Sequence, residues 1–381
     1  MKAVKQFNNK HLKELVLLFF KLGTISFGGP AAHIAMMENE VVKKRKWLTE
    51  QHFLDLIGAT NLIPGPNSTE MAIHIGHERA GWKGLIVAGL CFILPAVIIT
   101  GIFAVLYKEY GQLPQLQPFI YGIKPAIIAI ILAAIYPFAK KSLKTVELGI
   151  IGVITLILCL IGINEIYVMF GAGFIALALA AIRNHEVNSV NSIFPFTLLQ
   201  LSRTGFLSVN NLSIFFTFLK IGAILYGSGY VLFAFLDTAL VEKGILSRQQ
   251  LIDAIAVGQF TPGPVFSSVT FIGYQINGMT GAIVSTIGIF LPSFIFVALL
   301  NPLVKKMRNS ILFSAFLDSV NIASIAIIIA ICYQMGKDTI SDWRTIIVAV
   351  ASLILTFGFR KINSAFIVLG GSLAGYLLKL I

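Results

Sequence analysis

The chain has 381 residues, of which 57% are hydrophobic and only 12% are charged. A soluble domain is about 45–50% apolar and about 25% charged, so this chain carries more apolar surface than a core in water can bury. The composition therefore excludes a soluble globular protein and predicts one whose surroundings are themselves apolar.

The formal net charge of +12 comes from basic residues that are spread between apolar runs. Lys and Arg commonly flank membrane helices, so we expect contact with lipid and no nucleic-acid partner. Each of the three cysteines lies in an apolar run without a second cysteine nearby, which predicts neither a disulfide nor a metal site. Nucleotide-binding and hydrolase motifs are missing from the sequence, so we expect no enzyme activity and no cofactor.

Long apolar runs recur along the chain, and with their flanks they approach the roughly 20 residues that a helix needs to cross a bilayer. They lie at 85–106, 127–138, 148–163, 167–182 and 345–359. Backbone groups in hydrocarbon must be satisfied within the protein, which favours helices. We predict an all-α polytopic membrane protein.

The chain also repeats itself, and a repeat decides the architecture. The matching runs keep one order in both halves: Phe20-Lys21-Leu22-Gly23 with Leu219-Lys220-Ile221-Gly222, Pro64-Gly65-Pro66 with Pro262-Gly263-Pro264, and Leu94-Pro95 with Leu291-Pro292. Chance agreement at so many Gly and Pro positions is improbable, which indicates a duplication.

Each unit begins with a helix interrupted at glycine, continues with a segment broken at Pro-Gly-Pro and ends with four long apolar helices. The segment 52–78 is too short for two crossings, so we predict a re-entrant hairpin with Pro-Gly-Pro at its tip. Each unit then has about five crossings, and an odd number inverts the second unit relative to the first. We predict two inverted-topology repeats, at 1–183 and 213–381, joined by a cytoplasmic linker at 184–212.

The basic residues favour this inversion. The run Lys43-Lys44-Arg45-Lys46 follows the first helix of the first unit, whereas Lys305, Lys306 and Arg308 follow the Leu-Pro helix of the second. Placing both clusters in the cytoplasm forces opposite orientations in an inner membrane. The N-terminal lysines disagree, because this topology puts them outside.

Inverted repeats with broken helices are typical of secondary transporters, which bind substrate near the membrane midplane between the repeats. A half-helix starts after each Pro-Gly-Pro, and its first N–H groups and dipole attract anions. The alternative is that the breaks only shape helix packing. The predicted substrate-binding residues surround the breaks in both units: Gly28, Gly29, Asn61, Gly65, Asn67, Ser68, Thr69, Gly227, Ser228, Gly229, Gln259, Gly263, Val265, Phe266, Ser267 and Ser268.

Charged residues lie inside several of these helices. Lys21 and Lys220 occupy equivalent positions, and because a charge at membrane depth costs at least about 2.5 kcal/mol, we predict that they bind or attract the substrate; snorkelling to the interface is the alternative. Glu70 and His74 lie one turn apart and His33 lies on the broken first helix. These three predict proton coupling, with a structural pair as the alternative, and their spacing matches no metal motif.

The runs 20–30 (FKLGTISFGGP), 61–76 (NLIPGPNSTEMAIHIG) and 84–95 (GLIVAGLCFILP) resemble the chromate ion transporter family. The runs 221–232 (IGAILYGSGYVL), 253–266 (DAIAVGQFTPGPVF) and 288–294 (GIFLPSF) are similar to the second half of its long, two-domain members. The resemblance covers essentially the full chain. It implies export of chromate across the inner membrane, driven by the proton gradient or the membrane potential, and resistance to chromate.

The residues leave other functions open. Sulfate has the same shape and charge as chromate, so a sulfate uptake carrier is an alternative. An uncoupled oxyanion channel would use the same half-helix site, and an intramembrane enzyme would use Glu70 and His74 as acid and base. Many transporters of this kind dimerise, and the sequence leaves a homodimer open.

Overall fold

The computed structural model describes residues 2–27, 29–111, 113, 117–183, 210–226, 229–300, 310–359 and 362–380. Within these residues the ordered elements are helices, without a strand. The predicted site residues Gly28, Gly227 and Ser228, and nearly all of the predicted linker, lie outside this part of the chain.

The same order of elements occurs in both halves. The first half contains α1 (Lys2–Ile25), α2 (Gly29–Glu38), the π-helix η1 (Asn39–Lys44), α3 (Glu50–Thr60), α4 (Asn67–Tyr110), α5 (Gln117–Ser142), α6 (Val146–Leu160) and α7 (Glu165–Arg183). The second half contains α8 (Asn211–Ile224), α9 (Val231–Leu236), the π-helix η3 (Asp237–Val241), α10 (Arg248–Phe260), the short 3₁₀ helix η4 (Val265–Ser267), α11 (Ser268–Leu300), α13 (Ile311–Thr339), α14 (Trp343–Gly358) and α15 (Ser364–Lys379).

A short helix precedes each Pro-Gly-Pro loop. Thr49 caps α3 by accepting a hydrogen bond from the His52 N–H, and Ser247 caps α10 in a reciprocal capping box with Gln250. Residues 50–79, with the first loop (64–66), form the first hairpin, and residues 248–276, with the second loop (262–264), form the second. Each hairpin is therefore started by a hydroxyl cap and turned by proline and glycine.

Each hairpin leads into a long helix through a sharp bend. The helix α4 bends at Gly81, where φ is 58°, and α11 bends at Gly278, where φ is 60°. Glycine adopts this left-handed conformation without the steric cost that a Cβ atom adds. Both bends fold the hairpin limb back against the long limb, so that a Cβ atom on Gly84 would lie 2.0 Å from the Gly76 oxygen.

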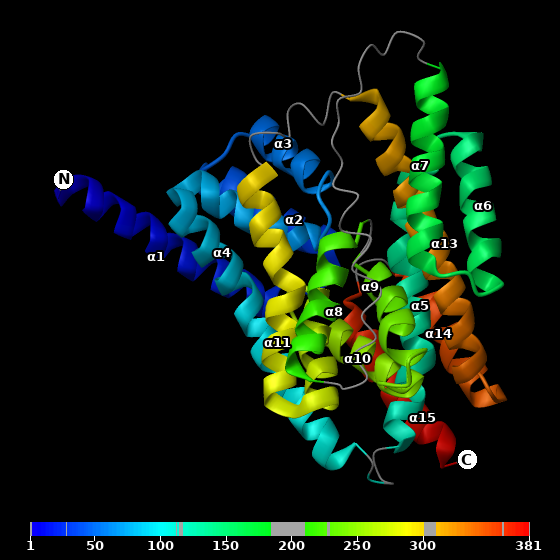
Figure 1. Ribbon diagram of the computed structural model, residues 1–381. Helices are drawn as coiled ribbons and strands as arrows, with labels where there is room; N and C mark the ends of the chain where they lie inside the picture. The colour runs from blue at the N-terminus through cyan, green and yellow to red at the C-terminus, as the bar shows by residue number, and fades with distance from the viewer. Residues whose placement is uncertain are drawn as a thin grey trace.

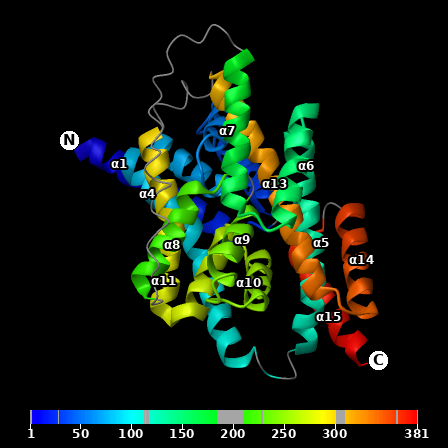
Figure 2. The ribbon, with the colours of Figure 1, turned by 45° about the vertical axis from the view of Figure 1, so that its right-hand side comes forward.

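The two halves pack through exchanged contacts. The helix α5 of the first half packs against α14 and α15 of the second, while α13 of the second half packs against α6 and α7 of the first. The hairpins lie toward opposite ends of the molecule: α3 is at the upper end in Figure 1 and α10 is at the lower end. Figure 2 shows the same division, with α6 and α7 above and α14 and α15 below.

Five helical stretches are long and apolar enough to cross a membrane: Asn67–Tyr110, Gln117–Ser142, Glu165–Arg183, Val265–Leu299 and Leu312–Thr339. The helices α6, α14 and α15 are apolar but have only 15 or 16 residues, and α1 is not in this set. The predicted multi-pass helical protein is confirmed at this level. The count of five crossings per unit stays a prediction.

The flanks of the predicted linker can be placed. The C-terminal end of α7 lies at the upper end in Figure 1. In contrast, α8 begins at Asn211, whose side chain accepts a hydrogen bond from Asn277 Nδ2 (2.7 Å) at the lower bend of α11. The two described flanks therefore lie at opposite ends of the molecule, and the cytoplasmic linker at 184–212 stays a prediction.

The contact between α5 and α15 depends on small residues. A Cβ atom on Gly371 would lie 2.7 Å from Ala126 Cβ, whereas a Cβ atom on the adjacent Gly370 would meet nothing within 4 Å. We expect Gly371→Leu to destabilise the protein by about 1–3 kcal/mol because the backbones would have to separate. Gly370→Leu is the matched control. Thermal unfolding in detergent would contradict this packing if both variants melted like the unmodified protein.

Candidate functional site

The two Pro-Gly-Pro loops contact the broken first helices of the opposite halves. The Gly65 N–H donates a hydrogen bond of 2.8 Å to the Leu225 oxygen, just beyond the end of α8. In the same way the Gly263 N–H donates a hydrogen bond of 2.8 Å to the Ser26 oxygen, just beyond the end of α1. The contacts are reciprocal, because each loop contacts the end of the first helix of the other half.

Glycine is required at both loops. Gly65 has a φ of 137° and Gly263 has a φ of 88°, which L side chains rarely adopt. A Cβ atom on Gly65 would lie 2.2 Å from Glu70 Oε1, and one on Gly263 would lie 3.1 Å from the Gly23 oxygen. A Cβ atom on Gly65 would also lie 2.7 Å from Ser293 Oγ of the other half, so glycine at both loops allows a close approach between the halves.

The residues that follow the loops are mostly buried. Ser68, Thr69 and Glu70 are buried in the first half, as are Val265, Phe266, Ser267 and Ser268 in the second. Asn67 is half-buried and donates a hydrogen bond of 2.8 Å from Nδ2 to Asn61 Oδ1, which ties the two flanks of the first loop together. The structure brings these predicted residues into the two loop regions.

Side chains from the opposite half reach these residues, and sequence reasoning missed them. Ser293 donates from Oγ to Glu70 Oε1 (3.3 Å), and Thr100 donates from Oγ1 to Ser267 Oγ (3.3 Å). Ser293 directly follows the Leu-Pro motif of the second half, so the repeat alignment offered a signal for it. Thr100 sits in a plain apolar run and offered none.

Tyr230 is a further missed residue, within the second half. Its hydroxyl donates to Gln259 Oε1 (3.4 Å) and lies 3.6 Å from where a Cβ atom of Gly29 would stand. At the second break, a Cβ atom on Gly229 would lie 3.5 Å from the Phe266 ring. The glycines at 29 and 229 thus allow the breaks to approach groups near the second loop.

Several buried polar atoms around the loops have no hydrogen-bond partner within the part of the chain that the structure describes. They are Ser26 Oγ, His33 Nδ1, Thr69 Oγ1, Glu70 Oε2, Gln259 Nε2, Ser268 Oγ and both ring nitrogens of His74. A buried polar group without a partner costs roughly 1–3 kcal/mol, and native structures contain few of them. Their concentration at the loops indicates a place where water or a polar ligand binds.

The three titratable residues differ in their surroundings. His33 interacts through Nε2 with the Ser26 oxygen (3.2 Å) and packs edge-on against Phe92, with ring centroids 5.6 Å apart. Among the described residues, the Glu70 carboxylate accepts a side-chain hydrogen bond through Oε1 from Ser293 only, and His74 makes no hydrogen bond to it although the two lie one turn apart. The expected Glu70–His74 pair is therefore not a direct hydrogen bond.

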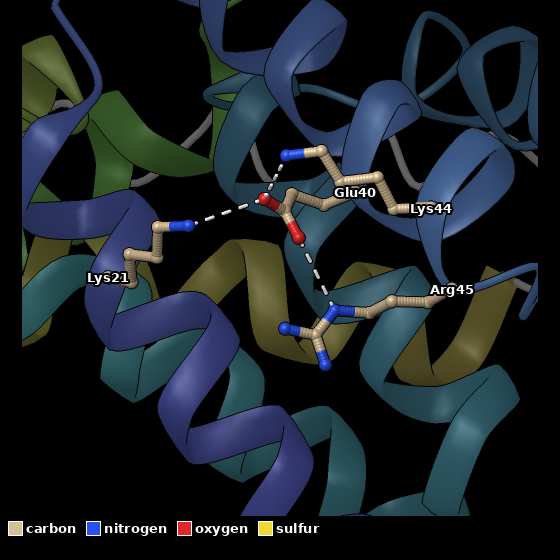
Figure 3. Close-up of polar contacts among 4 residues, drawn as sticks. All are labelled: Lys21, Glu40, Lys44 and Arg45. Carbon is tan, nitrogen blue, oxygen red and sulfur yellow. Dashed lines mark hydrogen bonds and ion pairs between the residues drawn. The ribbon is translucent and has the colours of Figure 1, made fainter.

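The predicted lysines lie elsewhere. The ammonium of Lys21 pairs with Glu40 Oε1 (3.4 Å), and its side chain is 54% exposed. Figure 3 shows Lys44 and Arg45 meeting the same carboxylate, at 3.1 and 3.4 Å. Lys220 is exposed on α8. Neither lysine is joined to a loop by a hydrogen bond among the described residues.

Glu40 lies on η1, outside the apolar helices, and only 10% of its side chain is exposed. Partial burial raises the pKa of its carboxyl, but hydrogen bonds from Lys44 and Lys21 and their charges lower it further. The net pKa lies below its ordinary value of 4.5. Glu40 is therefore the ionised centre of this cluster at neutral pH.

Two repeated helical units and a polar, loop-based centre between them define a multi-pass membrane protein of the transporter class. The chromate transporter family profile matches residues 13–177 and 212–376, once in each half. The chain belongs to this family.

Similarity to individual proteins agrees with this family assignment. A chromate transport protein of Cupriavidus metallidurans is 31% identical over 96% of this chain and 92% of its own. A probable chromate transport protein of Synechococcus elongatus is 29% identical over 96% of this chain and 95% of its own. An uncharacterised transporter of Bacillus subtilis aligns with 42% of this chain at 27% identity. No solved structure matches the chain.

Glu40 supplies a pH test. Because its folded pKa is lowered, its contribution to stability is fully present above the unfolded pKa, near 4.5, and is lost as the pH falls through the folded value. We expect Glu40→Gln to lower the melting temperature at neutral pH and to match the unmodified protein in acid. Glu38→Gln is the control, because Glu38 lies outside the Glu40 cluster and pairs with the exposed Lys43. A pH-independent difference would contradict this role.

Proposed function

We propose that this protein transports a tetrahedral dianion, chromate, and binds it between the two Pro-Gly-Pro loops. The observation that carries the proposal is the reciprocal pair of hydrogen bonds, from Gly65 N to Leu225 O and from Gly263 N to Ser26 O. Each loop opens a half-helix, and the unpaired N–H groups and positive dipole end of a half-helix attract anions without a cationic side chain. The names of the relatives supply the substrate.

The unpartnered polar atoms supply the remaining ligands. Thr69 and Ser268 present hydroxyls from opposite halves, and Gln259 presents an amide nitrogen. All of these can donate hydrogen bonds to oxyanion oxygens. A binding site that uses neutral donors and helix ends suits transport, because the anion must also be released.

The two units act as inverted repeats of an alternating-access transporter in the inner membrane, with each hairpin re-entering from its own side. Support comes from the positions of α3 and α10 at opposite ends of the molecule and from the exchanged packing of α5 and α13. Both loops are buried. Substrate therefore enters when one reciprocal contact separates while the other stays closed.

Glu70 couples transport to protons. Its carboxyl lies against Gly65 at the opening of the first half-helix, and the equivalent residue in the second half is the neutral Ser268. An ionised carboxylate there repels a dianion, and its burial without a cation is costly. Protonation therefore favours anion binding. The proton and the anion then move together, so a pH gradient drives chromate in the direction in which protons flow, whereas the membrane potential, negative inside, drives export of the dianion.

Transport itself is tested in proteoliposomes, with the pH gradient and the voltage varied separately. We expect saturable chromate uptake that sulfate competes with, since both are tetrahedral dianions. Asn67→Leu and Ser268→Ala should each reduce the rate by about tenfold or more, because each loses a site donor. Asn39→Leu, at an exposed position on η1, is the control. Normal transport by both site variants would place the site elsewhere.

The coupling prediction concerns Glu70→Gln, which keeps the shape of the side chain but cannot ionise. We expect this variant to bind chromate with nearly unchanged affinity and to lose uptake driven by a pH gradient. Retained pH-driven accumulation would contradict the role of Glu70. Flux that never accumulates chromate against a gradient, even in the unmodified protein, would indicate a channel.

A further inference from the structure

The two π-helices lie at the bases of the two hairpins, and their ionic clusters differ in charge. On η1, the carboxylate of Glu40 meets the cations of Lys21, Lys44 and Arg45, which leaves a net charge of +2 (Figure 3). The carboxylate is only 10% exposed, whereas the cations are 34–58% exposed. Glu40 thus holds three cations in one place while they face the surroundings.

The second π-helix has the opposite balance. Asp237 on η3 accepts a hydrogen bond of 2.7 Å from the Arg248 guanidinium, and Arg248 also pairs with Asp338 (3.4 Å). One cation between two carboxylates leaves a net charge of −1. Thr238, the next residue, donates to the carboxylate of Glu165 (2.5 Å), which adds a further acid.

Lys220 does not restore the balance. It stands at the position equivalent to Lys21, but no ion pair joins it to a carboxylate among the described residues. Together, Lys220 and Arg248 only match Asp237 and Asp338 in charge. Of the two ion-paired clusters, the one on η1 therefore carries an excess of positive charge and the one on η3 does not.

The Glu40 cluster also lies close to the proposed substrate site. Lys21 precedes Ser26 by five residues on α1, or about 8 Å at the rise of an α-helix. The Ser26 oxygen is the acceptor of the Gly263 N–H at the second loop. An anion held by the Glu40 cluster is thus one short step along α1 from that loop.

We propose that the Glu40 cluster is a capture site for doubly charged oxyanions at one mouth of the pathway, and that the missing counterpart at the other mouth makes the KM for the substrate lower on the side of the Glu40 cluster. The inference rests on the proposed function. Grouped charges of one sign raise the local concentration of a counter-ion and speed its association. A net charge of +2 favours a dianion over a monoanion of the same shape.

Kinetics measured from each side test the capture site. Chromate uptake is compared in everted and right-side-out membrane vesicles, which present opposite mouths to the substrate. We expect Lys44→Gln to raise the KM about fivefold, with unchanged kcat, only when the Glu40 cluster faces the substrate. Lys43→Gln is the matched control, because Lys43 is equally exposed but pairs with Glu38. Its KM should change less than about twofold.

A second variant removes a negative charge at the opposite mouth and so makes that mouth more positive. Asp338→Asn removes a half-exposed carboxylate and leaves the Arg248–Asp237 pair intact. We expect it to lower the KM from that side by about twofold or more. Sulfate should compete with chromate at the Glu40 mouth better than perchlorate, a tetrahedral monoanion, and Lys44→Gln should reduce this preference.

The outcomes separate the two proposals. Failure of the unmodified protein to move chromate from either side would refute the proposed function. Normal transport with equal KM values for Lys44→Gln and Lys43→Gln, or a change seen equally from both sides, would refute the capture site alone. A fall in melting temperature with an unchanged KM would show that the cluster only stabilises the fold, and would also refute the capture site.

Discussion

The exchange of two backbone hydrogen bonds between the halves is the constraint on which the architecture depends. Each Pro-Gly-Pro loop donates to the carbonyl at the end of the opposite first helix, at 2.8 Å in both cases. Such a contact needs a loop residue that has no side chain, and a first helix that ends where the loop of the other half reaches it. The glycines at 65 and 263 and the breaks after α1 and α8 meet these needs. The loops, breaks and exchanged packing therefore form one arrangement.

Small residues and buried polar atoms have different roles in this arrangement. Close backbone approach at Gly76–Gly84 and Gly273–Gly281 fixes the bends of α4 and α11, because no side chain separates the two limbs. Several polar atoms around the loops instead have no hydrogen-bond partner among the residues that the structure describes. Close backbone packing around a centre with unpaired polar atoms suits the proposed binding of an anion, because the anion would accept the missing hydrogen bonds and could be released again.

The sequence predicted those features that backbone geometry controls. Glycine and proline each favour particular backbone conformations, so the loops, the helix breaks and the duplication could be predicted from their positions. The partners Thr100 and Tyr230 could not be predicted from the sequence, because they approach across halves or across a helix break, whereas Ser293 directly follows the repeated Leu-Pro motif and was overlooked. Lys21 was read as a ligand because of its place in an apolar helix. Its partner Glu40 lies nineteen residues later, and only the turn made by α2 and η1 brings the two together.

Duplication within one chain has a consequence for chemistry. Two identical subunits around a true two-fold axis would carry the same side chain at both loops. Here the position after one loop is Glu70 and after the other is Ser268, and the ionic clusters on η1 and η3 differ in sign of charge. Fusion of the two copies let each mutate alone while the backbone contacts kept them matched. The molecule thus combines a symmetric skeleton with two chemically unequal sides.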